Sequence, residues 1–404
     1  MKNINYDLLK TIGEQYGSSF YILDSEQFRK NYIELQDAFR AIYPNSHIAY
    51  SYKTNYTPKL CKIVDELGGY AEIVSDMEYE IAKRIGVDAQ KIIFNGPYKN
   101  YQAVEEILLA GGTVNLDSAY EIPLIRGIAQ RHSDTTINIG IRCNFPINDN
   151  VTSRFGFDID TPEFSAALSL TEIPNIHMEE LHCHFASRRL DTWAPRARKM
   201  LELIDRLGIT PEHIDLGGGL FGKMNDSLKA QFDSYIPNYS EYASEVATLF
   251  AEHFTGDYQP MLFIEPGSAL VGDAMKFASP VVNIKTVGGK PIATLLGSIY
   301  NINPTLNKKN PPITVYSASE NRNEYSNLDF GGFTCIESDY LYRDYNGRLS
   351  AGDYVVFDNV GSYSIVLKPP FILPNFAVVD LSGDEIELIK QPEVFDDLFH
   401  TFVF

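Results

Sequence analysis

The sequence has only four cysteines in 404 residues, and none of them stands in a C-x-x-C pair. They are Cys61, Cys143, Cys183 and Cys335. So few and widely spaced cysteines are typical of a protein in a reducing compartment, and we therefore expect no disulfide. We expect Cys61 and Cys143 to be small buried hydrophobes, the usual role of an isolated cysteine.

Basic residues are also scarce, because 34 Lys and Arg face 53 Asp and Glu, which gives a net charge of −19. So acidic a chain is repelled by phosphate backbones and anionic lipids, which argues against nucleic acid or a membrane as partner. No stretch is apolar enough to span a bilayer, and residues 1–7 lack the apolar core of a signal peptide. We therefore expect a cytoplasmic location.

The hydrophobic fraction of 44% is that of a globular protein, and the length suits one large domain plus a second one. Between Lys53 and Glu265, β-type runs alternate with segments of helical periodicity. Eight strands in such an alternation predict a (β/α)₈ TIM barrel, with a doubly wound open sheet as the alternative. The expected strands are 47–52, 70–74, 91–94, 113–116, 137–141, 176–182, 213–216 and 261–264, and the clearest helices are 58–67, 76–85, 101–110 and 119–131.

After about residue 270 short β-type runs are separated by turn residues, which predicts an all-β domain. Residues 20–23 are expected to add a strand to it. We therefore predict a barrel over 25–270 and a β domain made of 1–24 plus 271–404. The expected runs of the β domain are 281–287, 291–296, 313–317, 353–357 and 375–381.

Polar or reactive residues follow every predicted barrel strand, and the carboxyl ends of barrel strands converge on one face. We therefore expect one active site built from residues that are remote in sequence. The residues concerned are Lys53, Ser75-Asp76, Asn95 to Lys99, Asp117-Ser118, Arg142, His182 to Ser187, Gly217 to Gly219 and Glu265 to Gly267.

Three of these strand ends suggest particular chemistry. A buried Lys53 can lose its proton and form a Schiff base with an aldehyde cofactor, although a solvated surface lysine is the alternative. The backbone N–H groups of Gly217 to Gly219 can hold a phosphate, or these residues form a flexible turn. Glu265 can keep a pyridine nitrogen protonated, or it forms a structural salt bridge.

His182 and His184 suggest zinc, but we expect strand alternation to send them to opposite faces. No further ligands stand at metal spacing, so we expect no metal. His184 is better placed as a flat ring packed on a planar cofactor. His182 is expected to be a core histidine.

Taken together, these residues resemble the fold-type III pyridoxal-phosphate decarboxylases, the group that contains diaminopimelate and ornithine decarboxylases. The resemblance covers nearly the whole chain, and it implies an alanine-racemase-like barrel plus β domain with pyridoxal 5'-phosphate as cofactor. The motifs that carry it are Tyr16 to Tyr21, Tyr52 to Asn55, Asp117 to Glu121, Ser153 to Gly156, His182 to His184, Gly217 to Gly219, Glu265 to Gly267, Cys335 to Asp339 and Gly361 to Tyr363.

The resemblance implies a role for each matching residue. Lys53 is the Schiff-base lysine, His184 stacks on the pyridoxal ring, and Glu265 meets the pyridinium. The residues implied to hold the phosphate are Ser187, Gly218, Gly219 and Tyr363, and Arg142 is expected among the cofactor-binding residues.

Enzymes of this group are head-to-tail dimers, which implies a homodimer with shared active sites. Cys335 and Asp339 then enter the partner subunit's site. Cys335 is implied to be the acid that reprotonates the carbanion after carbon dioxide leaves.

The departures from the family concern the substrate. Ser268 replaces the usual arginine after Glu-Pro-Gly, Ile336 replaces the acid that receives a distal amine, and 310–315 lacks the arginine expected before Tyr316. Ala186 also replaces a glycine before Ser187. An apolar Ile336 cannot compensate the desolvation of an ammonium group, so free diaminopimelate, ornithine or lysine is doubtful.

Arg188 and Arg189 follow Ser187 and either form a solvated pair or supply positive charge at the mouth of the site. In the second case they suit a small amino-acid substrate with extra carboxylates or an acyl group, such as a conjugate of siderophore or antibiotic biosynthesis. The expected substrate residues are Arg188, Arg189, Ser268, Tyr316, Ile336 and Asp339.

Three other functions remain open. The first is an ordinary diaminopimelate, ornithine or lysine decarboxylase. The second is an amino-acid racemase on the same barrel, which would place an arginine where Glu265 stands. The third is an inactive relative that binds a protein partner, against which Lys53, Glu265 and Cys335 argue.

Overall fold

The computed structural model describes residues 1–403, which form two compact units. The barrel unit comprises Asn31–Gly222 and Ser234–Ala269. The β unit comprises Met1–Lys30, Lys223–Asp233 and Leu270–Phe404. The segment 223–233 lies inside the range predicted for the barrel but groups with the β unit.

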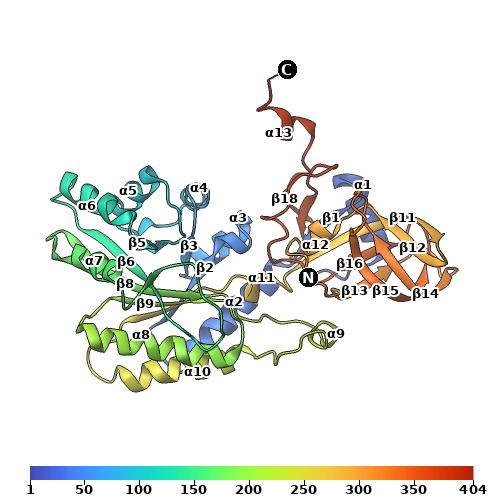
Figure 1. The fold of residues 1–404 in the computed structure, drawn as a ribbon. Helices are drawn as coiled ribbons and strands as arrows, with labels where there is room; N and C mark the ends of the chain where they lie inside the picture. The colour runs from blue at the N-terminus through green and yellow to red at the C-terminus, as the bar shows by residue number, and fades with distance from the viewer. Residues whose placement is uncertain (404) are drawn as a thin grey trace. The chain divides into compact units, whose positions relative to one another are not determined.

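The barrel unit is a closed parallel sheet, as predicted (Figure 1). Its strands follow the order β5-β4-β3-β2-β10-β9-β8-β6, and pairing of β5 with β6 closes the sheet, with Val114 opposite Ile139. This closure rules out the open doubly wound sheet. The strands are β2 (Ser46–Ser51), β3 (Tyr70–Ile73), β4 (Ile92–Phe94), β5 (Thr113–Leu116), β6 (Ile137–Asn144), β8 (Ile176–Phe185), β9 (His213–Gly218) and β10 (Met261–Ile264), and β7 (Phe157–Asp158) pairs with β6 outside the barrel.

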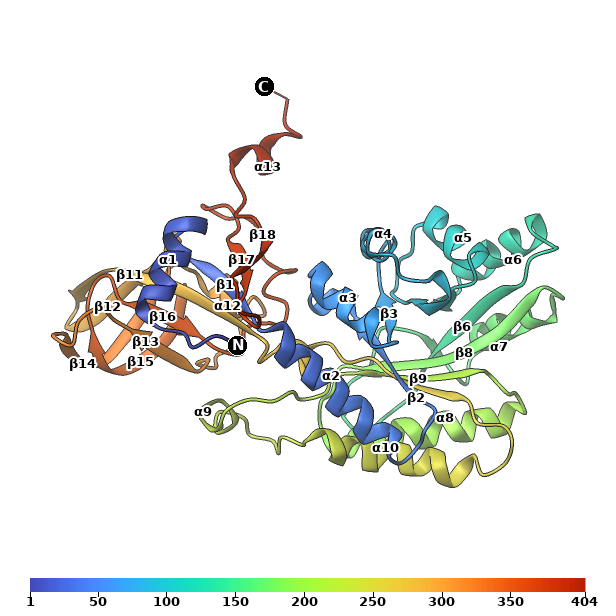
Figure 2. The same ribbon diagram turned by 180° about the vertical axis from the view of Figure 1, so that it is seen from behind.

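The barrel strands form where the sequence is apolar on both faces, because helices cover the outside and side chains fill the lumen. Every residue of β5 and β9 is buried. The covering helices are amphipathic: α8 buries Trp193, Ala197, Met200 and Ile204 along one stripe and packs beside α10 (Figure 2). The helices are α2 (Ser25–Arg40, shared by both units), α3 (Pro58–Glu66), α4 (Asp76–Ile85), α5 (Tyr101–Leu109), α6 (Glu121–Arg131), α7 (Pro162–Leu168), α8 (Trp193–Leu207) and α10 (Tyr239–His253).

The β unit contains a mixed sheet of order β15-β14-β12-β11-β1-β17-β18, with β16 joining β11 to β13. The predicted N-terminal strand is β1 (Phe20–Leu23), which pairs antiparallel with β11 and parallel with β17. Helix α1 (Tyr6–Tyr16) buries Leu9 and Ile12 against this sheet. The other strands are β11 (Met275–Val287), β12 (Lys290–Leu295), β13 (Ile313–Tyr316), β14 (Asn323–Gly331), β15 (Tyr340–Leu349), β16 (Tyr354–Phe357), β17 (Ala377–Asp380) and β18 (Glu387–Lys390), and short helices are α9 (Asp226–Lys229), α11 (Ser268–Val271), α12 (Ile299–Ile302) and α13 (Phe395–Phe399).

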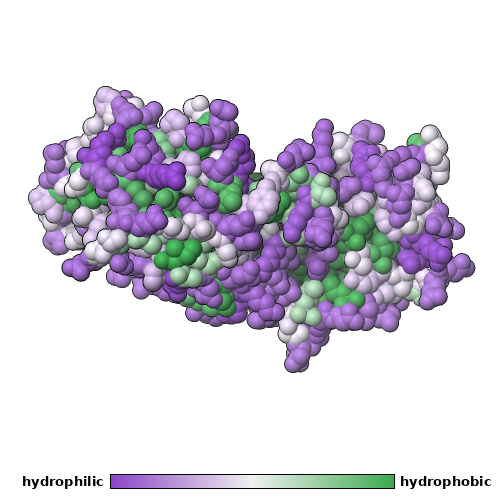
Figure 3. All heavy atoms as spheres, turned by 90° about the horizontal axis from the view of Figure 1, so that it is seen from below, coloured by the Kyte–Doolittle hydropathy of each residue, from purple (hydrophilic) through white to green (hydrophobic). Residues whose placement is uncertain are grey.

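Sequence periodicity did not predict β14, β15 and β18. Their residues are mostly half-buried or exposed and include many Asn, Asp, Glu and Arg side chains, so they lack the apolar alternation of a strand that covers a core. The face shown in Figure 3 is mostly hydrophilic, with hydrophobic atoms in scattered areas. Within residues 1–403, no helix has the length and apolar character needed to cross a bilayer.

Candidate active site

Lys53 lies directly after β2, in the single 3₁₀ turn Tyr52–Thr54. Its ammonium group contacts the buried carboxylate of Glu72 on β3 and lies 3.4 Å from Ser51 Oγ. Burial by itself lowers the pKa of Lys53, but Glu72 and then Glu265 outweigh it and leave that pKa above its usual value. The lysine is therefore held charged in a pair with a buried carboxylate.

A chain of buried polar side chains crosses the lumen from strand to strand. Asn95, after β4, donates from Nδ2 to Glu72 Oε1 at 3.2 Å and to Glu265 Oε1 at 2.5 Å. Asn115 on β5 donates to Asn95 Oδ1 at 2.8 Å and contacts the carboxylate of Glu180 on β8. Four strands thus fix the orientation of Glu265.

Glu265, after β10, is fully buried, and two histidine rings contact one of its carboxylate oxygens. Its Oε2 lies 3.0 Å from His184 Nδ1 and 3.4 Å from His182 Nε2. Burial raises the pKa of a carboxyl group, but His182, His184 and Lys53 hold the pKa of Glu265 well below its usual range. The site therefore contains an ionised buried carboxylate.

The prediction that His182 and His184 face opposite ways was wrong. Residues two apart on a strand share a face, because the side-chain period is 2, and both rings reach the same oxygen of Glu265. Burial lowers the pKa of His184 to about 3, in spite of Glu265. Its ring is therefore neutral at neutral pH, which suits a flat surface for stacking.

The pKa of Asp215 on β9 is shifted in the opposite direction to that of Glu265. Asp215 is fully buried, and neither carboxylate oxygen has a hydrogen-bond partner among the described residues. Burial raises its pKa well above the usual range, and the nearby Glu265, Glu180 and Glu72 raise it further. One lumen thus holds two acids whose pKa values are shifted in opposite directions, an arrangement typical of active sites.

The glycines at the end of β9 and directly after it lie where side chains would not fit. A Cβ on Gly217 would meet Glu265 Oε2 at 2.0 Å, and one on Gly219 would meet Arg188 Cγ at 2.6 Å. Gly218 has a φ of +138° and its Cβ would lie 2.2 Å from Arg196 Nη1. The glycines leave a backbone cradle at the strand end, which favours phosphate binding over a flexible turn.

Arg196 on α8 lies buried beside this turn, and the sequence analysis did not identify it. Its guanidinium donates to the carbonyl oxygens of Gly217 at 3.2 Å and Ser187 at 2.7 Å, while Nε has no partner among the described residues. Burial lowers its pKa to about 10, so the group stays charged at neutral pH. Its guanidinium lies 4.3 Å from the centre of the Trp193 ring, and no ion pair to it is found within residues 1–403, so a bound anion would compensate its charge.

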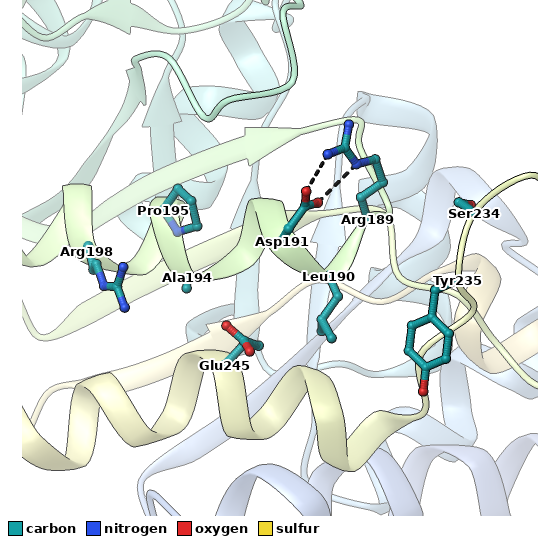
Figure 4. A pocket seen from close by; sticks show the side chains of 9 residues that line it. All are labelled: Arg189, Leu190, Asp191, Ala194, Pro195, Arg198, Ser234, Tyr235 and Glu245. Carbon is teal, nitrogen blue, oxygen red and sulfur yellow. Dashed lines mark hydrogen bonds and ion pairs between the residues drawn. The ribbon is translucent and has the colours of Figure 1, made fainter.

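The neighbouring Arg188 and Arg189 point in different directions. Arg188 runs along Gly219, with its guanidinium 5.7 Å from the centre of the Phe221 ring. Arg189 is exposed, and its Nε donates to Asp191 Oδ1 at 3.0 Å in a separate surface hollow of about 570 Å³ (Figure 4). Of these two arginines, only Arg188 lies beside the cradle.

Arg142, at the end of β6, joins two neighbouring strand ends. It donates to Asp117 Oδ1 at 3.1 Å and to the backbone oxygen of His184 at 3.4 Å. It therefore supports the position of His184. Ser187 is half-buried next to the cradle, and Ser268 opens α11 directly after Glu265-Pro266-Gly267.

The remaining predicted residues lie in the β unit. Cys335 is exposed and Ile336 is half-buried, both in the turn between β14 and β15. Asp339 fixes that turn: Oδ1 accepts from Ser298 and Ile299, and Oδ2 accepts twice from Thr334. Tyr316 ends β13, and Tyr363 has a φ of +64°, a rare conformation for a bulky residue.

Several site residues had not been identified from the sequence, namely Glu72, Asn95 as a ligand of Glu265, Asn115, Glu180, Asp215 and Arg196. A signal existed for some of them. Glu72, Glu180 and Asp215 are acids inside predicted apolar strands, and Arg196 stands on the apolar stripe of α8, three residues after Trp193. A charge at a core position indicates a partner or a function.

The chain is similar to known proteins over most of its length. Residues 27–272 match the family model for the pyridoxal-dependent decarboxylase, pyridoxal binding domain. Diaminopimelate decarboxylase of Methanocaldococcus jannaschii is 26% identical over 97% of this chain and 92% of the relative, and that of Aquifex aeolicus is 24% identical over 96% and 92%. The crystal structure of diaminopimelate decarboxylase from M. jannaschii superposes with a TM-score of 0.87 at 24% identity, covering 98% of this chain and 94% of that one.

Proposed function

Because the chain belongs to the family of pyridoxal-dependent decarboxylases, we propose that it decarboxylates an α-amino acid whose distal end carries a carboxylate. The family assigns pyridoxal phosphate as cofactor and a carboxy-lyase reaction on an amino acid. The nature of the distal group is the proposal.

The residues of the barrel fit this cofactor. The glycine turn, Ser187 and the uncompensated Arg196 suit its phosphate, Lys53 suits its aldehyde, and Glu265 suits its ring nitrogen. When bound, the cofactor supplies an electron-withdrawing ring that stabilises negative charge on the substrate's α-carbon.

The chain contributes binding, orientation and protons. Glu72 is placed to hold the proton that Lys53 releases. Glu265, kept ionised by His182 and His184, is suited to keep the ring nitrogen protonated. We assign Cys335 as the acid that returns a proton to the α-carbon, since it is an exposed thiol.

The ionised, buried Glu265 is the observation that carries the decarboxylase assignment. A racemase of this fold would place an arginine there. A neutral or cationic group beside the ring nitrogen would weaken electron withdrawal, whereas the hydrogen-bonded carboxylate strengthens it.

Two observations support a distal carboxylate. Arg188 lies beside the cradle and forms no ion pair within residues 1–403, so its charge is available to an anion. Ile336 replaces the acid that would receive a terminal ammonium group. We therefore favour an acylated diamino acid with a carboxylate on the acyl group, of the kind made in siderophore or antibiotic biosynthesis.

Diaminopimelate is the second candidate, because the relatives named above are diaminopimelate decarboxylases. It too has a distal carboxylate, but it also has a distal ammonium group. We further propose a homodimer in which Cys335 and Asp339 complete the partner's site, as the family resemblance implies.

Carbon dioxide release from matched substrate pairs tests the proposal. Nε-succinyl-lysine and Nε-propionyl-lysine differ by a distal carboxylate, and diaminopimelate and lysine differ in the same way. In whichever pair is turned over, we expect kcat/KM to be at least tenfold higher for the carboxylated member. Arg188→Ala should raise KM for that substrate, whereas the control Arg189→Ala should not. Efficient turnover of lysine or ornithine would contradict the proposal.

A further inference from the structure

At the amino-terminal end of the barrel, opposite the strand ends that carry the site, two histidines and two glutamates lie together. His177 and Glu179 belong to the start of β8, His213 is the first residue of β9, and Glu212 precedes it. These residues take no part in the proposed decarboxylation.

A bulge in β8 creates this cluster. Against β6, Met178 pairs with Ile139 and Glu180 with Gly140, so Glu179 is the extra residue between them. A bulge redirects side chains, and here both consecutive glutamates face His213: Glu179 Oε1 lies 3.5 Å from Nε2, and Glu180 Oε2 lies 3.6 Å from Nδ1.

Two of the three distances between the candidate ligand atoms around His177 match those of a metal site. Its Nε2 lies 3.4 Å from Glu179 Oε2 and 3.3 Å from Glu212 Oε1, and the three atoms lie within 4.8 Å of one another. With zinc–ligand bonds of about 2.0–2.1 Å, neighbouring ligand atoms of a tetrahedral site are about 3.3–3.4 Å apart.

Two buried ring nitrogens face the glutamates of this cluster, His177 Nε2 and His213 Nε2. His177 Nε2 is buried and makes no hydrogen bond, although two carboxylates lie beside it. His213 is 95% buried, since 5% of its surface is exposed; its Nε2 faces Glu179 Oε1 at 3.5 Å, while its Nδ1 faces Glu180 outside the cluster. A ring nitrogen placed between two carboxylates in this way is oriented as a ligand of a shared cation.

We infer that His177, Glu179 and Glu212 bind one divalent cation of the zinc class, with His213 orienting the Glu179 carboxylate through its other oxygen. An imidazole with two carboxylates suits zinc, and a fourth position is left for water. The ion would join the start of β8 to the residue before β9, so it would stabilise the barrel with little effect on turnover.

Metal titration of the holoenzyme tests this inference. Untagged protein with its cofactor bound is dialysed against a chelator and titrated with Zn²⁺ by calorimetry, followed by elemental analysis. We expect one ion per chain at micromolar or lower Kd, a higher melting temperature and unchanged kcat. Co²⁺ in its place should show the intense visible bands of a tetrahedral site.

His177→Gln and Glu212→Gln should each weaken binding at least tenfold. Both positions are partly or largely exposed, so neither variant should unfold the barrel. The matched control is His253→Gln. It removes another partly exposed histidine, which ends α10 and lies 3.2 Å from Asp205 of α8. A Kd of about 0.1 mM or weaker with fewer than one ion per chain would overturn the inference. Zn²⁺ binding by His177→Gln that equals that of the wild type would also overturn it and would place the ion elsewhere.

Discussion

Arg196 Nη1 lies 3.2 Å from the carbonyl oxygen of Gly217, so a buried cation on α8 supports the backbone of the glycine turn. The same guanidinium holds the carbonyl oxygen of Ser187 at 2.7 Å. One side chain thus fixes both segments predicted to receive the cofactor phosphate. It also places an uncompensated positive charge next to them.

Replacing Arg196 by lysine should weaken cofactor binding at least tenfold. Lysine keeps the charge but loses the planar fork that reaches two carbonyl groups at once. The affinity is measured by titrating cofactor-free protein with pyridoxal phosphate and following absorbance. Arg198→Lys, an exposed position two residues along the same helix, is the control. Equal affinities for both variants would show that Arg196 only stabilises the barrel.

Borohydride reduction of the holoenzyme should place the cofactor on Lys53 and leave Lys99 unlabelled. Lys99 is the other buried lysine of the barrel, and burial lowers its pKa, which would favour it as a nucleophile. It is, however, fully enclosed and bound to Glu121 and to the Gly96 carbonyl oxygen, both at 2.7 Å. Lys53 keeps 28% of its side chain exposed and is accessible. Peptide mapping decides between the two, and a label on Lys99 would end the assignment.

Glu78 should make the protein less stable as the pH rises. Burial raises its pKa from the ordinary 4.5 to about 7, with Val74 N–H and Lys53 opposing the shift. Between these values the unfolded chain has lost the proton and the folded chain still holds it, so the free energy of unfolding falls with increasing pH. The total decrease in the free energy of unfolding, complete above pH 7, is about 3 kcal/mol at most.

Glu78→Gln should therefore show a flatter pH dependence between pH 5 and 8 in urea unfolding. The control is Glu80→Gln on the same helix, because Glu80 is exposed and paired with Arg84 and Lys83. If the slope of the wild type persists in Glu78→Gln, another group is responsible.

Much of the fold was predictable because most residues of the barrel strands are buried and apolar. The strand-end residues Lys53, His184 and Glu265 were predictable for the same reason, since a barrel brings those ends together. The link from Asn95 to Glu265 was not, because it depends on side-chain reach across the lumen. Arg196 is contributed by a helix, and Glu179 by a bulge, and neither follows from a periodic pattern.

Mixing two inactive variants should restore activity if the active sites are shared between subunits. Lys53→Ala lacks the Schiff-base lysine, and Cys335→Ala lacks the thiol that we assign to the partner's site. Random exchange makes half of the dimers mixed, and each mixed dimer has one complete site, so activity should return to about a quarter of the wild type. Subunit exchange is verified by native mass spectrometry. A control mixture contains Cys61→Ala in place of Cys335→Ala, because Cys61 is buried in the barrel. Exchange without any recovered activity would mean that Lys53 and Cys335 of the same chain serve one site.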